Sequence, residues 1–171
     1  SRRQWRFVRQ SVRALAQALE ALGGSLVVRV GDVVEVLAEL HDGLRPQGGV
    51  AGLWSHEESG NAWTFARDRR VRDWARQAGV PWHELRQDGV VRRLGSRDQW
   101  AAHWDTFIAA PLTPPPARIA FTDVPSGTLP EAPGTLMPPD DCPDAQPGGR
   151  DAAAALLAGF LDMRGVEYAR G

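Results

Sequence analysis

The sequence predicts an α/β fold, in which helices flank a small Rossmann-like parallel sheet. Segments with the three- and four-residue spacing of amphipathic helices alternate with short apolar runs that are typical of buried strands. The order helix, strand, helix, strand, helix, strand, helix favours parallel strands joined by crossover helices. The series opens on a helix, so we expect the first strands of a sheet of this kind to be missing.

The first helix is expected over Gln4–Leu22, because its apolar residues recur in steps of three and four and share one face. Gly23-Gly24 provides a left-handed stop. The β-branched run Ser25–Val30 has the length and composition of a buried strand. Asp32 is a good N-cap for a second helix over Val33–Leu40.

The second strand is expected over Val50–Trp54 and the third over Val80–Leu85, on either side of a helix at Ala62–Ala78. A further helix is expected over Arg97–Ile108, because aromatic and aliphatic residues recur there at helical spacing. Four tryptophans at helical spacing are interpreted as core residues: Trp5, Trp74, Trp100 and Trp104.

A change of composition divides the chain. Residues 111–149 hold eleven of the thirteen prolines, a composition that cannot bury a core and predicts an interdomain linker. A helical pattern returns after it. We therefore expect a partial α/β domain at 1–110, a Pro- and Gly-rich linker at 111–149 and a terminal helix at 150–171.

Composition limits the function classes. The net charge of −1 argues against a globally basic nucleic-acid binder, although a local basic patch is compatible with it. The lone Cys142 excludes an internal disulfide and a cysteine-based metal site. No apolar run approaches the roughly 18 residues of a membrane helix, so we expect no membrane partner and a cytoplasmic location. The chain starts at Ser1 without Met and ends just after a helical pattern, so both ends are expected to be cut.

The loop His56–Asn61 is the first candidate site. It follows a predicted strand, and ligands of open α/β sheets bind beyond the carboxyl ends of the strands. Glu57, Glu58 and Asn61 are therefore candidates for ligand contact. The alternative is a loop whose carboxylates cap the next helix and whose Gly60-Asn61 pair makes a turn. A zinc-protease motif is excluded, because position 60 is Gly rather than a second His, and no metal site is expected.

Arginines gather in two places. The five arginines of the helix at 62–78 are interpreted as a solvated face with ion pairs, such as Arg69 with Asp73, rather than as a phosphate-tracking surface. Arg92 and Arg93 are better candidates for contact with DNA or with a second domain.

The order and spacing of several segments resemble the cryptochrome/DNA photolyase family. The run WSHEESGN at 54–61, followed by WTFARDRRV and then QDGVVRRL, is similar to the N-terminal α/β domain of that family. Residues 2–36 resemble its helix-strand-helix, and residues 97–104 resemble the segment that closes the domain. Residues 148–168 resemble the opening of the helical FAD-binding domain.

This resemblance implies a fragment of a flavoprotein that has FAD as its cofactor and lacks two upstream strands. The implied parent is deoxyribodipyrimidine photolyase, in which an excited reduced flavin passes an electron to a pyrimidine dimer in DNA, the dimer splits and the electron returns. Tyr168 falls where the family has a flavin-contacting tyrosine, and the loop residues Glu57, Glu58 and Asn61 would face a second, antenna chromophore. Thr64 replaces the glutamate that binds an antenna folate, which puts folate in doubt.

Two alternatives stay open. One is a blue-light photoreceptor cryptochrome without repair activity, from which a photolyase would differ in the flavin domain. The other is a stand-alone α/β nucleotide-binding module, although the sequence contains neither a Gly-x-Gly-x-x-Gly motif nor a P-loop. Under the resemblance, this chain alone is not expected to be catalytic.

Overall fold

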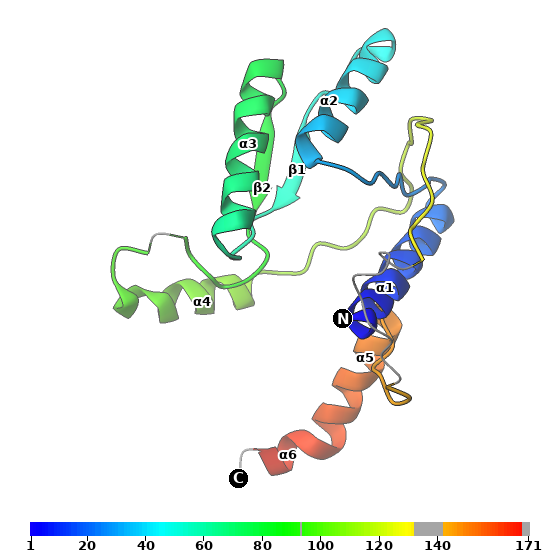
Figure 1. Cartoon of the computed structure of the whole chain (residues 1–171). Coiled ribbons are helices and arrows are strands. Elements are labelled where there is room, and N and C mark those ends of the chain that lie inside the picture. The colour runs from blue at the N-terminus through cyan, green and yellow to red at the C-terminus, as the bar shows by residue number, and fades with distance from the viewer. Residues whose placement is uncertain (93, 132–141, 169–171) are drawn as a thin grey trace. The chain divides into compact units, whose positions relative to one another are not determined.

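The computed structural model describes residues 1–92, 94–131 and 142–168, with the side chains of 166 and 167 excepted. The chain forms two compact units. Unit 1 comprises Ser1–Arg29 and Pro115–Gly171, and unit 2 comprises Val30–Pro114. Figure 1 labels the helices and strands of both units.

Unit 2 is built on a β-α-β arrangement of strand β1 (Leu53–His56), helix α3 (Ala62–Ala78) and strand β2 (Trp82–Leu85). The two strands pair in parallel, with Ser55 opposite Glu84. Parallel neighbours require a crossover connection, and α3 provides it. The predicted α/β class with a parallel sheet and flanking helices is confirmed.

Both ends of α3 follow from local chemistry, and both match the prediction. The Asn61 side-chain oxygen accepts hydrogen bonds from the backbone N–H groups of Trp63 (3.0 Å) and Thr64 (3.1 Å), as an N-cap does. Gly79 ends the helix at φ 69°, in the left-handed region that glycine adopts without steric cost.

The core of unit 2 is small and lies between α3 and the sheet. Val71 and Ala75 of α3 are buried together with Val80, at 6%, 2% and 4% exposure. Along β1 and β2, half-buried and exposed residues alternate, as expected for a sheet covered on one face. On the exposed side, Trp54 stacks on His83 with ring centroids 5.1 Å apart.

Helix α2 (Val33–Leu44) precedes the sheet and contacts α3. Asp32 caps it as predicted, and it runs four residues beyond the expected end at Leu40. An edge-to-face contact between His41 of α2 and Trp74 of α3, with centroids 6.1 Å apart, joins the two helices. A short 3-10 turn, η1 (Arg45–Gln47), follows α2.

The helix predicted over Arg97–Ile108 begins as the 3-10 turn η2 (Arg97–Gln99) and continues as α4 (Trp100–Ala109). Trp100 and Trp104 stack on each other with centroids 5.5 Å apart, and they are 44% and 38% exposed. Their interpretation as core residues is therefore wrong for the described structure. Helical spacing places side chains on one face but does not supply a surface to cover it.

Unit 1 contains α1 (Arg2–Ala21) and the helical end of the chain, α5 (Arg150–Gly159), the π-helical η4 (Phe160–Arg164) and α6 (Gly165–Tyr168). Ser1 and Gln4 form a capping box at the start of α1.

The segment before α5 lies against α1 at Gly148-Gly149. The Gly148 N–H donates to Oε1 of Gln10 (2.8 Å), and the Gly149 N–H donates to Oγ of Ser11 (3.1 Å). A Cβ atom added at Gly148 would lie 2.2 Å from the Phe7 carbonyl oxygen, so only glycine permits this approach.

The expected strand Ser25–Val30 is wrong: these residues form no strand in the structure. The Val28 N–H donates to Oγ of Ser126 (2.9 Å), and the Val28 carbonyl accepts from the Gly127 N–H (2.9 Å). A β-branched run fits a pleated surface only where neighbouring strands are present, and here the bonds to residues 126 and 127 are isolated ones that involve Val28 and the Leu26 carbonyl.

The strand predicted over Val50–Trp54 is shifted, and β1 covers Leu53–His56 instead. Its pairing is bounded by hydrogen bonds from the Leu53 N–H to the Pro81 carbonyl and from the Glu57 N–H to the Leu85 carbonyl, both 2.8 Å. His56 therefore belongs to the strand, and the loop begins at Glu57.

Candidate functional site

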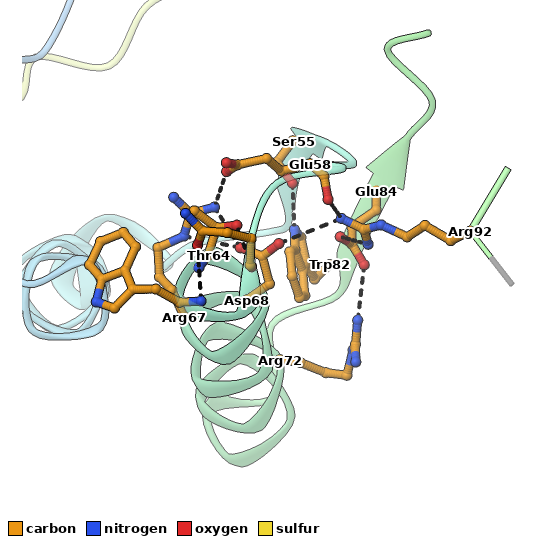
Figure 2. A network of polar contacts seen from close by, with 11 residues as sticks. Ser55, Glu58, Thr64, Arg67, Asp68, Arg72, Trp82, Glu84 and Arg92 are labelled. Carbon is orange, nitrogen blue, oxygen red and sulfur yellow. Dashed lines mark hydrogen bonds and ion pairs between the residues drawn. The ribbon is translucent and has the colours of Figure 1, made fainter. Parts of the chain in front are cut away.

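The loop after β1 is held by a network of arginines and carboxylates, drawn in Figure 2. Helix α3, strand β2, the loop after β1 and the segment after β2 contribute to it. Glu58 lies in the loop, Asp68 in α3 and Glu84 in β2, and the arginines are Arg67 and Arg72 of α3 and Arg92, which follows β2.

Arg67 joins the loop to α3. Its Nη2 donates to Oε2 of Glu58 at 2.5 Å, and its Nη2 and Nε donate to Oδ1 of Asp68 at 2.7 and 3.0 Å. The hydrogen bonds to Asp68, and secondly those to Glu58, raise the pKa of the Arg67 guanidinium above its usual value. Arg67 is therefore a fixed positive charge that turns the Glu58 carboxylate toward α3.

Asp68 is the buried charged residue of the network, with 8% exposure. It shares one face of α3 with the buried Val71 and Ala75, three and seven positions later, which explains why it faces the sheet. Its second oxygen, Oδ2, lies 3.6 Å from Nη2 of Arg92. A buried carboxylate is tolerated when it is paired in this way.

Arg92 links the start of the loop to β2. Its Nη1 donates to Oε1 of Glu84 at 3.1 Å, and its Nη2 donates to the backbone carbonyl of Glu58. The side chain is 26% exposed. Its predicted contact with DNA or with a second domain stays a prediction, and Arg93 lies outside the described residues.

The network continues across the sheet. The other carboxylate oxygen of Glu84 accepts from Nη2 of Arg72 at 3.1 Å, and the Arg72 guanidinium lies over the Trp82 ring, 5.6 Å from its centroid. Nε1 of Trp82 donates to Oγ of Ser55 on the neighbouring strand at 2.9 Å. Contacts between polar and aromatic side chains thus connect β1 to β2, β2 to α3, and β2 through Arg92 to the loop after β1.

The predicted loop residues have different surroundings. Glu58 pairs with Arg67, and the cap of α3 comes from Asn61 and not from a carboxylate of the loop. Glu57 extends the strand pairing through its N–H and is half-buried. Beside the loop lies an open hollow of about 400 Å³. Its lining residues are Glu58, Ser59, Gly60, Asn61, Ala62, Thr64, Phe65 and Arg92.

A second hollow of about 310 Å³ lies at the start of α2 and is lined in part by Asp32, Trp63 and Arg70. Arg70 holds the Asp32 carboxylate through two hydrogen bonds of 2.8 and 2.9 Å. The bond from Arg70 is the main reason that the pKa of Asp32 is lowered. The sequence analysis identified Asp32 as a cap but missed this bidentate partner.

Tyr168, the predicted flavin contact, belongs to unit 1. Its side chain is 82% exposed and meets Phe160 edge-on, with centroids 6.0 Å apart. Among the described residues, no three His, Cys, Asp or Glu side chains gather as a metal site. No helix in the described ranges is long and apolar enough to cross a membrane.

The fold is that of a small α/β domain with two parallel strands. A family model for DNA photolyase matches residues 1–103. The match covers more than half of the chain, which therefore belongs to the DNA photolyase family, as the sequence resemblance indicated. Members of this family generally bind FAD and typically bind DNA. No curated protein matches the chain.

Proposed function

We propose that this chain is the antenna-side part of a light-driven DNA-repair flavoprotein that splits pyrimidine dimers. Its membership of the photolyase family supports this function. In the full-length protein, residues 1–110 would form the α/β domain, 111–149 the linker and 150–171 the opening of the helical FAD-binding domain. FAD, when bound there, supplies the electron transfer.

The hollow at the end of β1 supports a binding role for the α/β domain. The network fixes one residue of its wall, Glu58: Arg67 holds the Glu58 side chain, and Arg92 holds the Glu58 carbonyl. Phe65, at 48% exposure, offers an apolar surface next to these polar groups. A flat heteroaromatic antenna ring needs such a combination, since its faces are apolar and its edges carry hydrogen-bonding groups.

The described residues are a poor fit to FAD itself. Tyr168 is exposed, and a single phenol beside Phe160 does not form a flavin pocket. We therefore derive no step of flavin chemistry from this chain and assign Tyr168 only the role of a flavin contact in the complete protein. Arg92 and Arg93 are proposed to contact DNA or the helical domain there.

The chromophore proposal is tested in the full-length protein with the double substitution Glu57→Ala and Glu58→Ala. Loss of one charged hydrogen-bond partner costs about 1.5–3 kcal/mol, or roughly 10- to 100-fold in affinity. The antenna content of the purified protein, measured by absorption, should fall while its FAD content stays constant. Retention of both chromophores at the original ratio would leave the loop with a structural role alone.

Arg67→Gln is the matched control. It breaks the same ion pair from the side of α3, and Arg67 does not line the loop hollow. If this variant loses as much antenna chromophore as the carboxylate variant, Glu58 acts by holding the loop and not by touching the ligand.

Repair is separated from photoreception by illuminating the full-length protein with an oligonucleotide that carries one pyrimidine dimer. Chromatography should show the dimer converted to two pyrimidines under blue light and unchanged in the dark. A protein that binds FAD and undergoes photoreduction, but leaves the dimer intact, is a photoreceptor.

A further inference from the structure

Helix α5 is entered through two glycines, Gly148 and Gly149. Gly149 is the N-cap residue, with φ 110° and ψ 160°, a backbone conformation that L side chains rarely adopt. It has no side chain that could form a cap hydrogen bond, whereas the first N–H groups of a helix need partners from outside the helix. The start of α5 is therefore a flexible joint unless another element holds it.

Two consecutive side chains of α1 hold this joint. Oε1 of Gln10 accepts from the Gly148 N–H at 2.8 Å, and Oγ of Ser11 accepts from the Gly149 N–H at 3.1 Å. The Ser11 hydroxyl donates its one hydrogen to the Phe7 carbonyl at 3.0 Å, so its oxygen acts toward Gly149 as an acceptor. Helix α1 thus presets the orientation of this acceptor. We call Gln10, Ser11, Gly148 and Gly149 the glycine lock.

The lock requires both glycines. A Cβ atom at Gly148 would lie 2.2 Å from the Phe7 carbonyl oxygen and 2.7 Å from Oγ of Ser11. At Gly149 it would lie 3.3 Å from Cβ of Ala14. The backbone of the joint therefore lies directly on α1. The same two residues have the greatest backbone freedom once their hydrogen bonds to α1 are broken.

Beyond the lock, most of α5 projects into solvent. Asp151 and residues 153–158 are exposed, and the large apolar side chains Leu156 and Leu157 are 46% and 58% exposed. Figure 1 shows α5 starting beside α1 and running away from it toward η4. A helix that is held mainly at one end, through a glycine joint, takes its direction from that joint.

We propose that the glycine lock is a conformational device with two states. In the closed state it holds α5 in one direction relative to α1, and in the open state α5 swings about Gly148 and Gly149. Each neutral hydrogen bond favours the closed state by about 2- to 12-fold, so the two bonds together favour it by roughly 5- to 150-fold. This device belongs to the chain as it stands and is independent of the antenna and flavin roles proposed above.

The test measures the distance between nitroxide labels on α1 and α5 in the 171-residue chain by double electron–electron resonance. The labels are attached at Gln17→Cys and Ala158→Cys, two exposed positions, after Cys142→Ser has removed the native thiol. The parent chain should give one dominant narrow distance. Gln10→Ala with Ser11→Ala should add a broad component and lower the ratio of narrow to broad roughly 5- to 150-fold. An unchanged distribution overturns the proposal.

Arg13→Ala with Glu20→Ala is the matched control on the same helix. Both side chains are exposed and form no hydrogen bond or ion pair among the described residues. Alanine is the best helix former, so the control and the lock variant both keep α1 helical. The control should retain the narrow distance. Equal broadening would mean that any change in α1 releases α5, and the lock would lose its role.

Hydrogen exchange tests one bond of the lock without disturbing the other. Gln10→Met keeps the length of the side chain but offers only a weak acceptor, whereas Gln10→Glu keeps a strong one. The Gly148 amide, followed by NMR, should exchange about 2- to 12-fold faster in the Met variant and no faster than in the parent in the Glu variant. Equal rates in the Met variant and the parent would refute the lock, as would equal acceleration in both variants.

Discussion

Asp68→Asn should destabilise unit 2 by about 2 kcal/mol. Asp68 is 8% exposed, and its carboxylate accepts two hydrogen bonds from Arg67 and lies 3.6 Å from a nitrogen of Arg92. Removing one partner of an isolated buried pair costs about 3–5 kcal/mol. Here Arg67 keeps Glu58 and Arg92 keeps Glu84, so the loss approaches that of charged hydrogen bonds, about 1.5–3 kcal/mol.

The assay is urea unfolding followed by tryptophan fluorescence. A slope of about 2 kcal/mol per molar converts the loss into a midpoint lowered by about 1 M urea. The control is Asp73→Asn on the same helix, whose ion pair with Arg76 joins side chains that are 56% and 75% exposed. It should cost less than about 0.5 kcal/mol. Equal effects of the two variants would refute the conclusion that burial makes Asp68 important.

Three other predictions follow from local geometry. The pKa of Asp32 is lowered in the folded protein, so its ion pair with Arg70 stabilises the fold fully above the unfolded pKa of about 3.9. This stabilisation is lost as the pH falls through the lower folded pKa. Asp32→Asn keeps the cap and should reduce the acid-induced loss of stability in urea titrations from pH 6 to 2. Gly148→Ala should clash with the α1 backbone and speed proteolysis of the preceding segment, whereas Gly159→Ala, which meets no atom within 4 Å, should not. Trp82→Phe and Ser55→Ala should each cost about 0.5–1.5 kcal/mol in urea unfolding and should not add in the double variant, since they remove one shared hydrogen bond; full additivity would contradict that bond.

Sequence reasoning succeeded where the signal was local. The bounds of α3 could be predicted because Asn61 and Gly79 each act within a few residues of their own position. The parallel pairing of β1 with β2 followed from the helix between them. The strand expected at Ser25–Val30 failed because strand formation depends on neighbours that lie far away in the sequence, and composition alone does not place them.

The candidate site could be predicted only in part, for a related reason. The loop was found because it follows a strand. The burial of Asp68 was missed, although its phase with Val71 and Ala75 was a readable signal that one carboxylate in an arginine-rich helix faces inward. The role of Arg92 was not accessible from the sequence, because its partner Glu84 and the Glu58 carbonyl are brought to it by the strand pairing.

The network changes how the two glutamates of the loop should be interpreted. The Glu58 carboxylate forms an ion pair with Arg67. A ligand in the neighbouring hollow therefore contacts a neutralised pair and not a free negative charge. Within the described part of the chain, Glu57 is held through its backbone N–H, which donates to the Leu85 carbonyl. Glu57 is not among the residues that line this hollow, and the double substitution should therefore be resolved into its two single variants. Glu58→Ala should weaken binding as much as Arg67→Gln does, through loss of loop order, whereas Glu57→Ala should leave binding unchanged.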